Sequence, residues 1–457
     1  MEKDTIAAIA TPLGEGGIGI VRTSGPASRE IGTKLLRTGG KIPIFKPHIF
    51  QYGRFVGRSG EVIDEVMFVW MESPRSFTKE DVLEIHAHGG ILVMKKILGE
   101  VLSCGARLAL PGEFTKRAFL NGRIDLSQAE AVIDLIRAKC DAAAGSAIKQ
   151  LDGALSKKLA ACEERLYAYM AQLEAAIDFP EDEIPGVMYG EMEKDLIRIM
   201  DELDRLLETS GHGRILREGL GMVIIGRPNV GKSSLLNYFL QEERAIVTPA
   251  PGTTRDTIEE TVNLEGIPLR ITDTAGLRET DEPAERMGVE KARRCLAQAE
   301  LVLFVLDSSE ELTEEDRDIG ALLKGRRVVA VLNKTDLPRR LGEDEVRALL
   351  PGIPVAAVSL LKGQGLECLK SAILKEIGTM KASGAADLIL TNTRHAALLE
   401  QARQHLGEAL SSIKQRLPED LVAVDLKASL LSLGEVTGKT FTSELLDQIF
   451  SRFCIGK

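Results

Sequence analysis

This sequence of 457 residues has no run of about 18 uncharged apolar residues, so it predicts no membrane-spanning helix. Its first residues, Met-Glu-Lys-Asp-Thr, lack the basic and then apolar profile of a secretory signal, and we therefore expect a cytoplasmic protein. Its six cysteines include no CxxC pair. That absence favours free thiols over a disulfide framework or a zinc site.

A surplus of basic residues is also missing. The chain has 58 Lys and Arg against 68 Asp and Glu, which gives a formal net charge of −10. Proteins that clamp nucleic acid through many phosphates usually carry a basic surplus. We therefore expect any contact with RNA to be local, or to be shared with a partner.

The composition changes along the chain, and 457 residues exceed the size of one ordinary core. Short strand-like runs with Gly and Pro turns in residues 1–117 predict an α+β domain. Apolar residues have helical spacing over residues 118–216 and 382–457, whereas strands alternate with helices over residues 217–381. This order favours a doubly wound α/β domain inserted in an all-α domain, although two separately packed helical segments would show the same periodicity.

A glycine-rich segment, Gly226-Arg-Pro-Asn-Val-Gly-Lys-Ser, stands between a buried-strand run and a segment with helical spacing. It matches the G-x-x-x-x-G-K-S phosphate loop in its required setting. Glycines let backbone N–H groups surround phosphates, and the helix N-terminus adds a favourable dipole. Lys232 would reach the outer phosphates, and Ser233 would bind Mg²⁺. The predicted phosphate-binding residues are Asn229, Val230, Gly231, Lys232, Ser233 and Ser234.

Three further motifs follow in the order of a GTPase. The first, Gly252-Thr-Thr-Arg-Asp, supplies Thr254 as a second magnesium ligand. The second, Asp273-Thr-Ala-Gly, places Asp273 near the magnesium and offers the Gly276 amide to the γ-phosphate.

The third motif, Asn333-Lys334-Thr-Asp336, follows a strand-like run. Its carboxylate can accept hydrogen bonds from guanine N1 and N2, a donor pair that adenine lacks. Ser359 stands where such enzymes place a backbone contact to the guanine oxygen. Together the motifs predict a Ras-like G domain that hydrolyses GTP.

The residue after Asp-x-x-Gly, which is a water-orienting glutamine in many GTPases, is Leu277. Another residue must position water, and another cation must neutralise the developing charge. Asn229 and the carbonyls of residues 248–252 offer oxygens that can hold a monovalent cation. The residues alone leave two hypotheses open: a monovalent-cation site at Asn229, and a simple turn in which Asn229 binds no cation.

Two weaker patterns do not predict sites. The segment Gly14–Gly19 fits G-x-G-x-x-G, but a strand-like run follows it and no helix that could receive a pyrophosphate. His86 and His88 share one strand face, but no third metal ligand is evident, so we expect a turn after the strand.

Over essentially its whole length the chain resembles the MnmE (TrmE) family of tRNA-modification GTPases. The resemblance rests on the G motifs, on residues 110–126 (LPGEFTKRAFLNGRIDL) and on the terminal Cys-Ile-Gly-Lys. It implies a role for Glu285 in orienting the attacking water. It also implies K⁺ at Asn229, Thr248, Ala250 and Thr253, the two threonines also contacting GTP, and Mg²⁺ at Ser233 and Thr254.

The same resemblance makes residues 1–117 a folate-binding and dimerisation domain, residues 118–216 and 382–457 the two parts of the helical domain, and residues 217–381 the G domain. A 5-formyl- or 5,10-methylene-tetrahydrofolate would bind the first domain. Some relatives carry lysine at the position of Arg123, which keeps the charge but alters the contact. Cys454 would act in modification and not in GTP hydrolysis. The implied folate-binding residues are Arg22, Glu80, Arg123 and Lys457.

The resemblance implies a homodimeric, potassium-stimulated GTPase activated by dimerisation of its G domains. With a flavoprotein of the MnmG (GidA) type it would install a carboxymethylaminomethyl or aminomethyl group on the wobble uridine of tRNA. Two alternatives remain open: a ribosome-assembly GTPase of the Era or Der type, and a folate-independent GTP-driven switch. Neither alternative predicts binding of 5-formyltetrahydrofolate.

Overall fold

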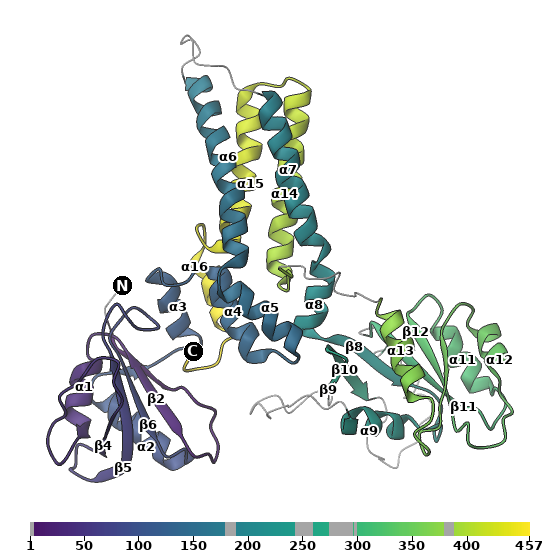
Figure 1. Ribbon diagram of the computed structural model, residues 1–457, viewed down its shortest axis with the longest axis horizontal. Coiled ribbons are helices and arrows are strands. Elements are labelled where there is room, and N and C mark those ends of the chain that lie inside the picture. Colours follow the sequence, from purple (N-terminus) through teal and green to yellow (C-terminus); the bar gives the residue numbers. More distant parts are fainter. Residues whose placement is uncertain (1–3, 179–188, 243–258, 274–295, 297–298, 379–387) are drawn as a thin grey trace. The chain divides into compact units, whose positions relative to one another are not determined.

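The computed structural model describes residues 4–178, 189–242, 259–273, 296, 299–378 and 388–457. The chain divides into two compact units. Unit 1 comprises Met1–Ile133, Gln150–Asp195 and Gln404–Lys457, and unit 2 comprises Asp134–Lys149 and Leu196–Arg403. Figure 1 shows the elements of each unit, which are described separately below.

Unit 1 contains a sheet in which, among the described residues, seven strands lie in the order β3-β4-β5-β6-β2-β1-β7. Neighbouring strands are antiparallel, except that β1 and β7 are parallel. Strand β2 directly follows the Gly14–Gly19 segment, so this loop leads into a strand and not into a helix. The strands are β1 Ile6–Ile9, β2 Gly19–Ser24, β3 Leu36–Arg37, β4 Gln51–Val56, β5 Val62–Met71, β6 Val82–Ala87 and β7 Arg107–Leu108.

Helices α1 (Ser28–Leu35) and α2 (Ile91–Ser103) pack on this sheet. Ile31 of α1 and Ile97 of α2 share one buried cluster with Phe68 of β5. Because side chains alternate between the two faces of a strand, this cluster draws on one face of the sheet. The predicted α+β architecture of the N-terminal part is confirmed.

The C-terminal helix α16 (Ser443–Phe450) returns to the N-terminal part of unit 1, where it packs against α3 (Glu113–Leu120). Thr442 caps α16 by accepting a hydrogen bond from the Leu445 amide, and Phe450 is buried beside Phe119. Gly112, at a φ of +67°, lies so close that a Cβ there would be 2.7 Å from the Phe450 carbonyl oxygen. Only glycine permits this approach of two backbones.

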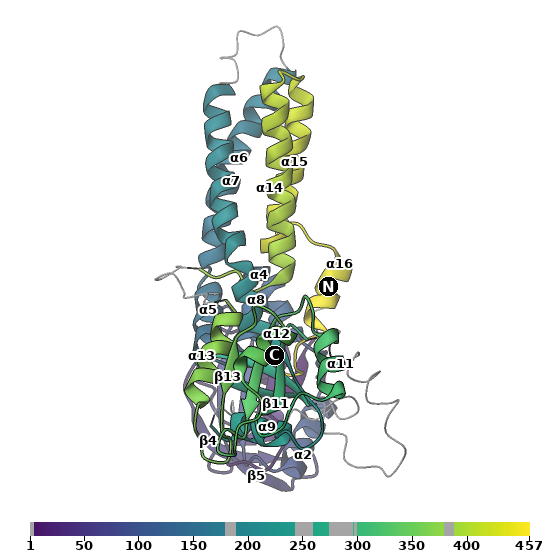
Figure 2. The same cartoon turned by 90° about the vertical axis from the view of Figure 1, so that its right-hand side faces the viewer.

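Seven further helices of the described ranges belong to unit 1, to unit 2 or to both. Helix α6 runs along α15, as Figures 1 and 2 both show. No helix in the described ranges is both long enough and apolar enough to span a membrane. These helices are α4 Leu126–Arg137, α5 Asp141–Leu151, α6 Ala154–Asp178, α7 Tyr189–Glu208, α8 Ser210–Glu218, α14 Thr393–Lys414 and α15 Glu419–Thr437.

Unit 2 contains a second sheet in which six described strands lie in the order β13-β12-β11-β8-β10-β9. All neighbours are parallel except β9 and β10. Helices α9, α11, α12 and α13 connect or follow its strands. The elements are β8 Leu220–Ile225, α9 Lys232–Glu242, β9 Glu259–Leu264, β10 Ile267–Asp273, β11 Leu301–Asp307, α11 Glu314–Leu322, β12 Val328–Asn333, α12 Glu343–Leu349, β13 Val355–Ala357 and α13 Leu366–Glu376.

Both faces of this second sheet are buried. Along β11, Leu303 and Val305 join a cluster with α9 and α13, whereas Phe304 and Leu306 join a cluster with α11 and α12. A strand covered on both faces needs a continuous apolar run, which is what LVLFVL in β11 provides. The predicted doubly wound sheet is confirmed, and helices precede and follow it in the chain.

Candidate functional site

The phosphate-loop segment connects β8 to α9, as the motif requires. The Lys232 ammonium donates to the carbonyl oxygens of Gly226, at 2.8 Å, and Arg227, at 2.7 Å, so this side chain folds back over the loop. Ser233 and Ser234 are exposed in the first turn of α9. This short segment therefore combines the Lys232 ammonium, the N-terminus of α9 and the exposed Ser233 hydroxyl.

The backbone of this loop depends on residues that accept positive φ. Asn229 has a φ of 63°, and its side chain is exposed. Gly231 has a φ of +107°, and a Cβ there would lie 2.2 Å from Nδ2 of Asn333. Strain and lack of space both exclude a larger residue at Gly231.

Asn333 joins the two halves of the nucleotide site. It ends β12 with 4% exposure. Its Nδ2 donates to the Val230 carbonyl oxygen at 2.8 Å, and its Oδ1 accepts from the Leu360 amide at 3.2 Å. The buried amide therefore holds the phosphate loop against the loop that follows β13.

The Asp336 carboxylate is oriented by a hydrogen bond from Ser359. The buried Ser359 hydroxyl donates to Asp336 Oδ1 at 2.6 Å. This hydrogen bond lowers the pKa of Asp336, so the carboxylate is ionised near neutral pH. Ser359 Oγ also accepts from the Lys362 amide at 3.2 Å, which fixes the orientation of the hydroxyl. An oriented carboxylate of this kind can accept the two N–H groups of guanine.

Asp307, which the sequence analysis did not identify, lies beside these residues. It ends β11 directly opposite Asn333, and Lys334 forms an ion pair of 2.6 Å with its Oδ2. Burial would raise the pKa of Asp307, but Lys334 and Ser309 together outweigh burial and lower it. The sequence did contain a signal for Asp307, because it ends an otherwise apolar strand-like run. Since unpaired charges are rarely buried, a carboxylate in that position indicates a partner of opposite charge.

Several predicted residues of this site lie outside the described residues. Of the four implied potassium ligands, Asn229 is the one that lies within them. Asp273 ends β10, where its backbone pairs with Ile224 of β8, the strand that leads into the phosphate loop. The predicted residues outside the described ranges are Thr248, Ala250, Thr253, Thr254, Gly276 and Glu285.

A second group of predicted residues lies in unit 1, where Arg22 meets the C-terminal tail. Arg22 donates through Nη1 to the Gly456 carbonyl oxygen at 3.1 Å and through Nε to Glu84 Oε1 at 2.7 Å. Lys457 is half-buried nearby, and burial together with the charge of Arg22 lowers its pKa. The structure thus brings two of the four implied folate-binding residues together, along with Glu84, which the sequence analysis missed.

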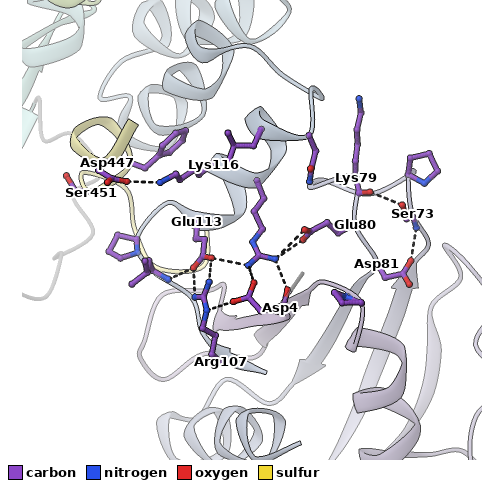
Figure 3. A pocket seen from close by; sticks show the side chains of 18 residues that line it. Asp4, Ser73, Lys79, Glu80, Asp81, Arg107, Glu113, Lys116, Asp447 and Ser451 are labelled. Atoms are coloured by element: carbon purple, nitrogen blue, oxygen red, sulfur yellow. Dashed lines mark hydrogen bonds and ion pairs between the residues drawn. The ribbon is translucent and has the colours of Figure 1, made fainter. Parts of the chain in front are cut away.

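Glu80 lies beside a cavity of about 1150 Å³, shown in Figure 3. Its Oε2 accepts from the Ser24 hydroxyl at 2.6 Å and from Arg117 at 3.2 Å. Arg117 also pairs with Asp4 and Glu113, so this carboxylate belongs to a larger ion-pair network at the cavity wall.

The other predicted residues of unit 1 are Arg123 and Cys454, for which the structure shows no ion pair with this network among the described residues. Arg123 donates to the Ser76 carbonyl oxygen at 3.3 Å, and its guanidinium lies 4.8 Å from the centre of the Phe77 ring. Burial lowers the pKa of Arg123. Cys454 is exposed, and its carbonyl oxygen accepts from the Gly112 amide at 3.4 Å.

The chain matches two family models. The model described as the MnmE helical domain matches residues 126–454, and the model described as the GTP-binding protein TrmE N-terminus matches residues 5–123. Proteins named tRNA modification GTPase MnmE from Geobacillus kaustophilus and Bacillus subtilis are each 48% identical to it. The first alignment covers 100% of both chains, and the second covers 99% of this chain and 100% of the relative.

One solved structure, the G domain of the T. maritima FeoB iron transporter, is 27% identical to this chain. It covers 34% of this chain and 98% of its own, with a TM-score of 0.27.

Gly231→Ala tests whether the phosphate loop needs its contact with Asn333. We expect GTP affinity to fall by about tenfold or more, because the new Cβ meets the buried amide and the backbone is strained by about 1–3 kcal/mol. Titration with a fluorescent GTP analogue measures the loss. Gly325→Ala is the matched control, since its φ of +79° is equally unusual but open space surrounds it. Wild-type affinity in Gly231→Ala would contradict the prediction.

Proposed function

The chain belongs to the MnmE family of tRNA modification GTPases, and we propose that it couples GTP hydrolysis to modification of the wobble uridine in tRNA. The observation that carries the GTPase part is the Asn333 amide, which holds the phosphate loop and the base-recognition loop in one arrangement. The full-length match to the relatives supports this proposal over a ribosome-assembly GTPase or a folate-independent switch.

The phosphate end of the site suits a magnesium nucleotide. Ser233 and Thr254 would hold Mg²⁺, which neutralises charge on the phosphate oxygens when it is bound. The exposed hydroxyl of Ser233 beside Lys232 fits this role. On nucleotide binding, Lys232 would exchange its two loop carbonyls for phosphate oxygens, and Asp336 would accept the guanine N–H groups.

We further propose that K⁺ assists hydrolysis. Its ligands would be Asn229, Thr248, Ala250 and Thr253, and Glu285 would orient the attacking water. The exposed Asn229 side chain on a left-handed backbone supports the first of these contacts. Leu277 has no hydrogen-bonding group, so a cation and a separate carboxylate would supply what that position lacks. Dimerisation of the G domains would activate the reaction.

The modification chemistry would take place at the other site, formed by residues 1–117, by Arg123 and by the C-terminal tail. Arg22, Glu80, Arg123 and Lys457 would bind a 5-formyl- or 5,10-methylene-tetrahydrofolate. The two cations that meet at the tail suit the anionic glutamate end of such a ligand. Cys454, which lies in the same unit as these four residues, would take part in the modification.

Redox chemistry would come from a flavoprotein partner of the MnmG (GidA) type, and the product would be 5-carboxymethylaminomethyl- or aminomethyl-uridine. Because the chain is acidic overall, contact with tRNA would be local or shared with this partner. Such an enzyme would work in the cytoplasm. The proposed domains are residues 1–117, the helical parts 118–216 and 382–457, and the G domain 217–381.

A homodimer would form through the N-terminal sheet. Tyr52 of β4 and Met67 of β5 are directly opposite each other, with 61% and 47% exposure. Neighbouring apolar side chains at Ile49 and Phe50 are also about half exposed. Exposed apolar side chains on neighbouring strands favour a protein partner, and a second copy would cover them symmetrically.

Loss of the modification tests the central proposal. In a strain that lacks the gene, mass spectrometry of tRNA nucleosides should show unmodified wobble uridine. The wild-type gene should restore the modified nucleoside, and Cys454→Ser should not, although its GTP hydrolysis stays normal. Wobble uridines that remain modified in the deletion strain would end the proposal.

Potassium dependence is tested on the purified protein by comparing GTP turnover in potassium and sodium buffers of equal ionic strength. We expect turnover to be at least about tenfold faster in potassium, since one electrostatic contact to the developing charge contributes that much or more. Affinity for GTP should change little. Equal rates in the two buffers would refute a catalytic cation.

Met67→Asp tests the dimer surface, because a charge placed on each copy would face its equivalent across a symmetric interface. Sedimentation velocity should show a species of half the wild-type mass. Leu361→Asp, at a residue with 86% exposure in unit 2, introduces the same charge elsewhere and should leave the dimer intact. A dimeric Met67→Asp variant would move the interface to another surface.

A further inference from the structure

Two buried residues, Phe453 and Gly456, anchor the C-terminal tail, and between them the Cys454 carbonyl oxygen accepts one hydrogen bond of 3.4 Å from the Gly112 amide. Phe453, just before the tail, is 5% exposed and packs with Phe450 in the cluster shared by α3, α4 and α16. Gly456 is buried against β1, and Cys454 and Ile455 between these two anchors are exposed. The position of the thiol therefore depends on both anchors.

The Gly456 anchor is made by the backbone. Gly456 has a φ of +96°, and a Cβ there would lie 2.5 Å from the Ile9 carbonyl oxygen and 2.9 Å from Ala10 Cα. Such close approach of two backbones leaves room only for glycine. A hydrogen bond from Arg22 Nη1 to the Gly456 carbonyl oxygen links Gly456 to β2.

Arg22 itself is held by Glu84. The two residues are register partners on β2 and β6, and their side chains form an ion pair of 2.7 Å with 17% and 16% exposure. Glu84 Oε2 also contacts His86 Nε2 at 3.3 Å, and the His86 ring lies edge-on to Phe50. Both oxygens of the Glu84 carboxylate therefore have a partner, Arg22 at Oε1 and His86 at Oε2.

Glu84 also balances the charges at this anchor. Arg22 and Lys457 are two cations close enough for Arg22 to lower the pKa of Lys457, whereas Glu84 acts in the opposite direction. Burial would raise the pKa of Glu84, but His86 and Arg22 outweigh burial and lower it to about 2. The carboxylate is consequently ionised at any pH at which the enzyme would work.

We propose that Glu84 is a positioning residue for the C-terminal tail: by fixing Arg22 it keeps Gly456 on β1 and so sets the location of the Cys454 thiol. Without the charge of the carboxylate, Arg22 Nε keeps at most a weaker, neutral acceptor, and Arg22 and Lys457 lose the negative charge that Glu84 places beside them. The Gly456 anchor then opens while the Phe453 anchor remains. The importance of this device for catalysis rests on the proposed function of the tail.

Carboxypeptidase B, which removes a C-terminal lysine, tests the proposal on the full-length protein. Lys457 can be cleaved only when the Gly456 anchor opens, so its rate of removal reports that opening, and intact-mass spectrometry measures it. Glu84→Gln should speed removal about tenfold or more, as expected for loss of one charged hydrogen bond. Glu65→Gln is the matched control, because Glu65 forms an ion pair with Arg54 on the same sheet away from the tail. It should leave the rate unchanged.

Folding of each variant is checked with Trp70, the single tryptophan of the chain, which is buried in the same sheet. If Glu84→Gln keeps the wild-type unfolding of Trp70 and the wild-type rate of Lys457 removal, the proposal is wrong. If Glu84→Gln fails to fold, Arg22→Lys decides. It keeps the positive charge but cannot reach Glu84 and Gly456 together, and it must also speed removal for the proposal to stand.

The tRNA assay separates this inference from the proposed function. Faster Lys457 removal in Glu84→Gln with normal modification would support the anchor and remove the tail from the chemistry. An unchanged rate, together with loss of modification in Cys454→Ser, would refute the anchor and retain the function.

Discussion

The side-chain amide of Asn333 connects the phosphate loop to the loop that follows β13, and the nucleotide site is organised around it. The amide is 4% exposed, so leaving either of its polar atoms without a partner would cost about 1–3 kcal/mol. The Val230 carbonyl and the Leu360 amide meet that need and thereby bring two loops into one arrangement. The same contact requires glycine at position 231, because a Cβ would occupy the space of the amide. The doubly wound sheet supports this contact by ending β11 and β12 at the same edge.

The site in unit 1 is built on a different principle. Its polar groups come from adjacent strands and from the end of the chain, and Arg22 and Gly456 are 434 positions apart in sequence. Ion pairs contribute to its geometry, because Arg22 pairs with Glu84 of the neighbouring strand and Arg117 of α3 pairs with Glu80. Because such charges are only partly exposed, their partners fix the side chains in single orientations. A tail attached in this way can carry a functional group to a sheet that lies far from it in the sequence.

Much of the fold could be predicted from local patterns. The alternation of strands and helices over residues 217–381 predicted a doubly wound sheet, and the mixed composition of residues 1–117 predicted an α+β domain. These predictions succeeded because strand and helix periodicity are local properties of the chain. The candidate sites were harder to predict from the sequence. Asp307 and Glu84 were missed because their roles depend on ion pairs with Lys334, which follows β12, and with Arg22 of β2.

The sequence by itself determined where the phosphate loop lies, since such a loop is a contiguous strand–loop–helix with glycines at fixed positions. It also predicted Asn333, Lys334 and Asp336 as the residues for the guanine base, because all three lie at the end of one strand-like run. Only the tertiary structure decided which carboxylates pair with Lys334 and Arg22, and where the last four residues lie. Contacts between distant residues are set by strand register and by the packing of α16 on α3, and neither leaves a periodic signal in the sequence.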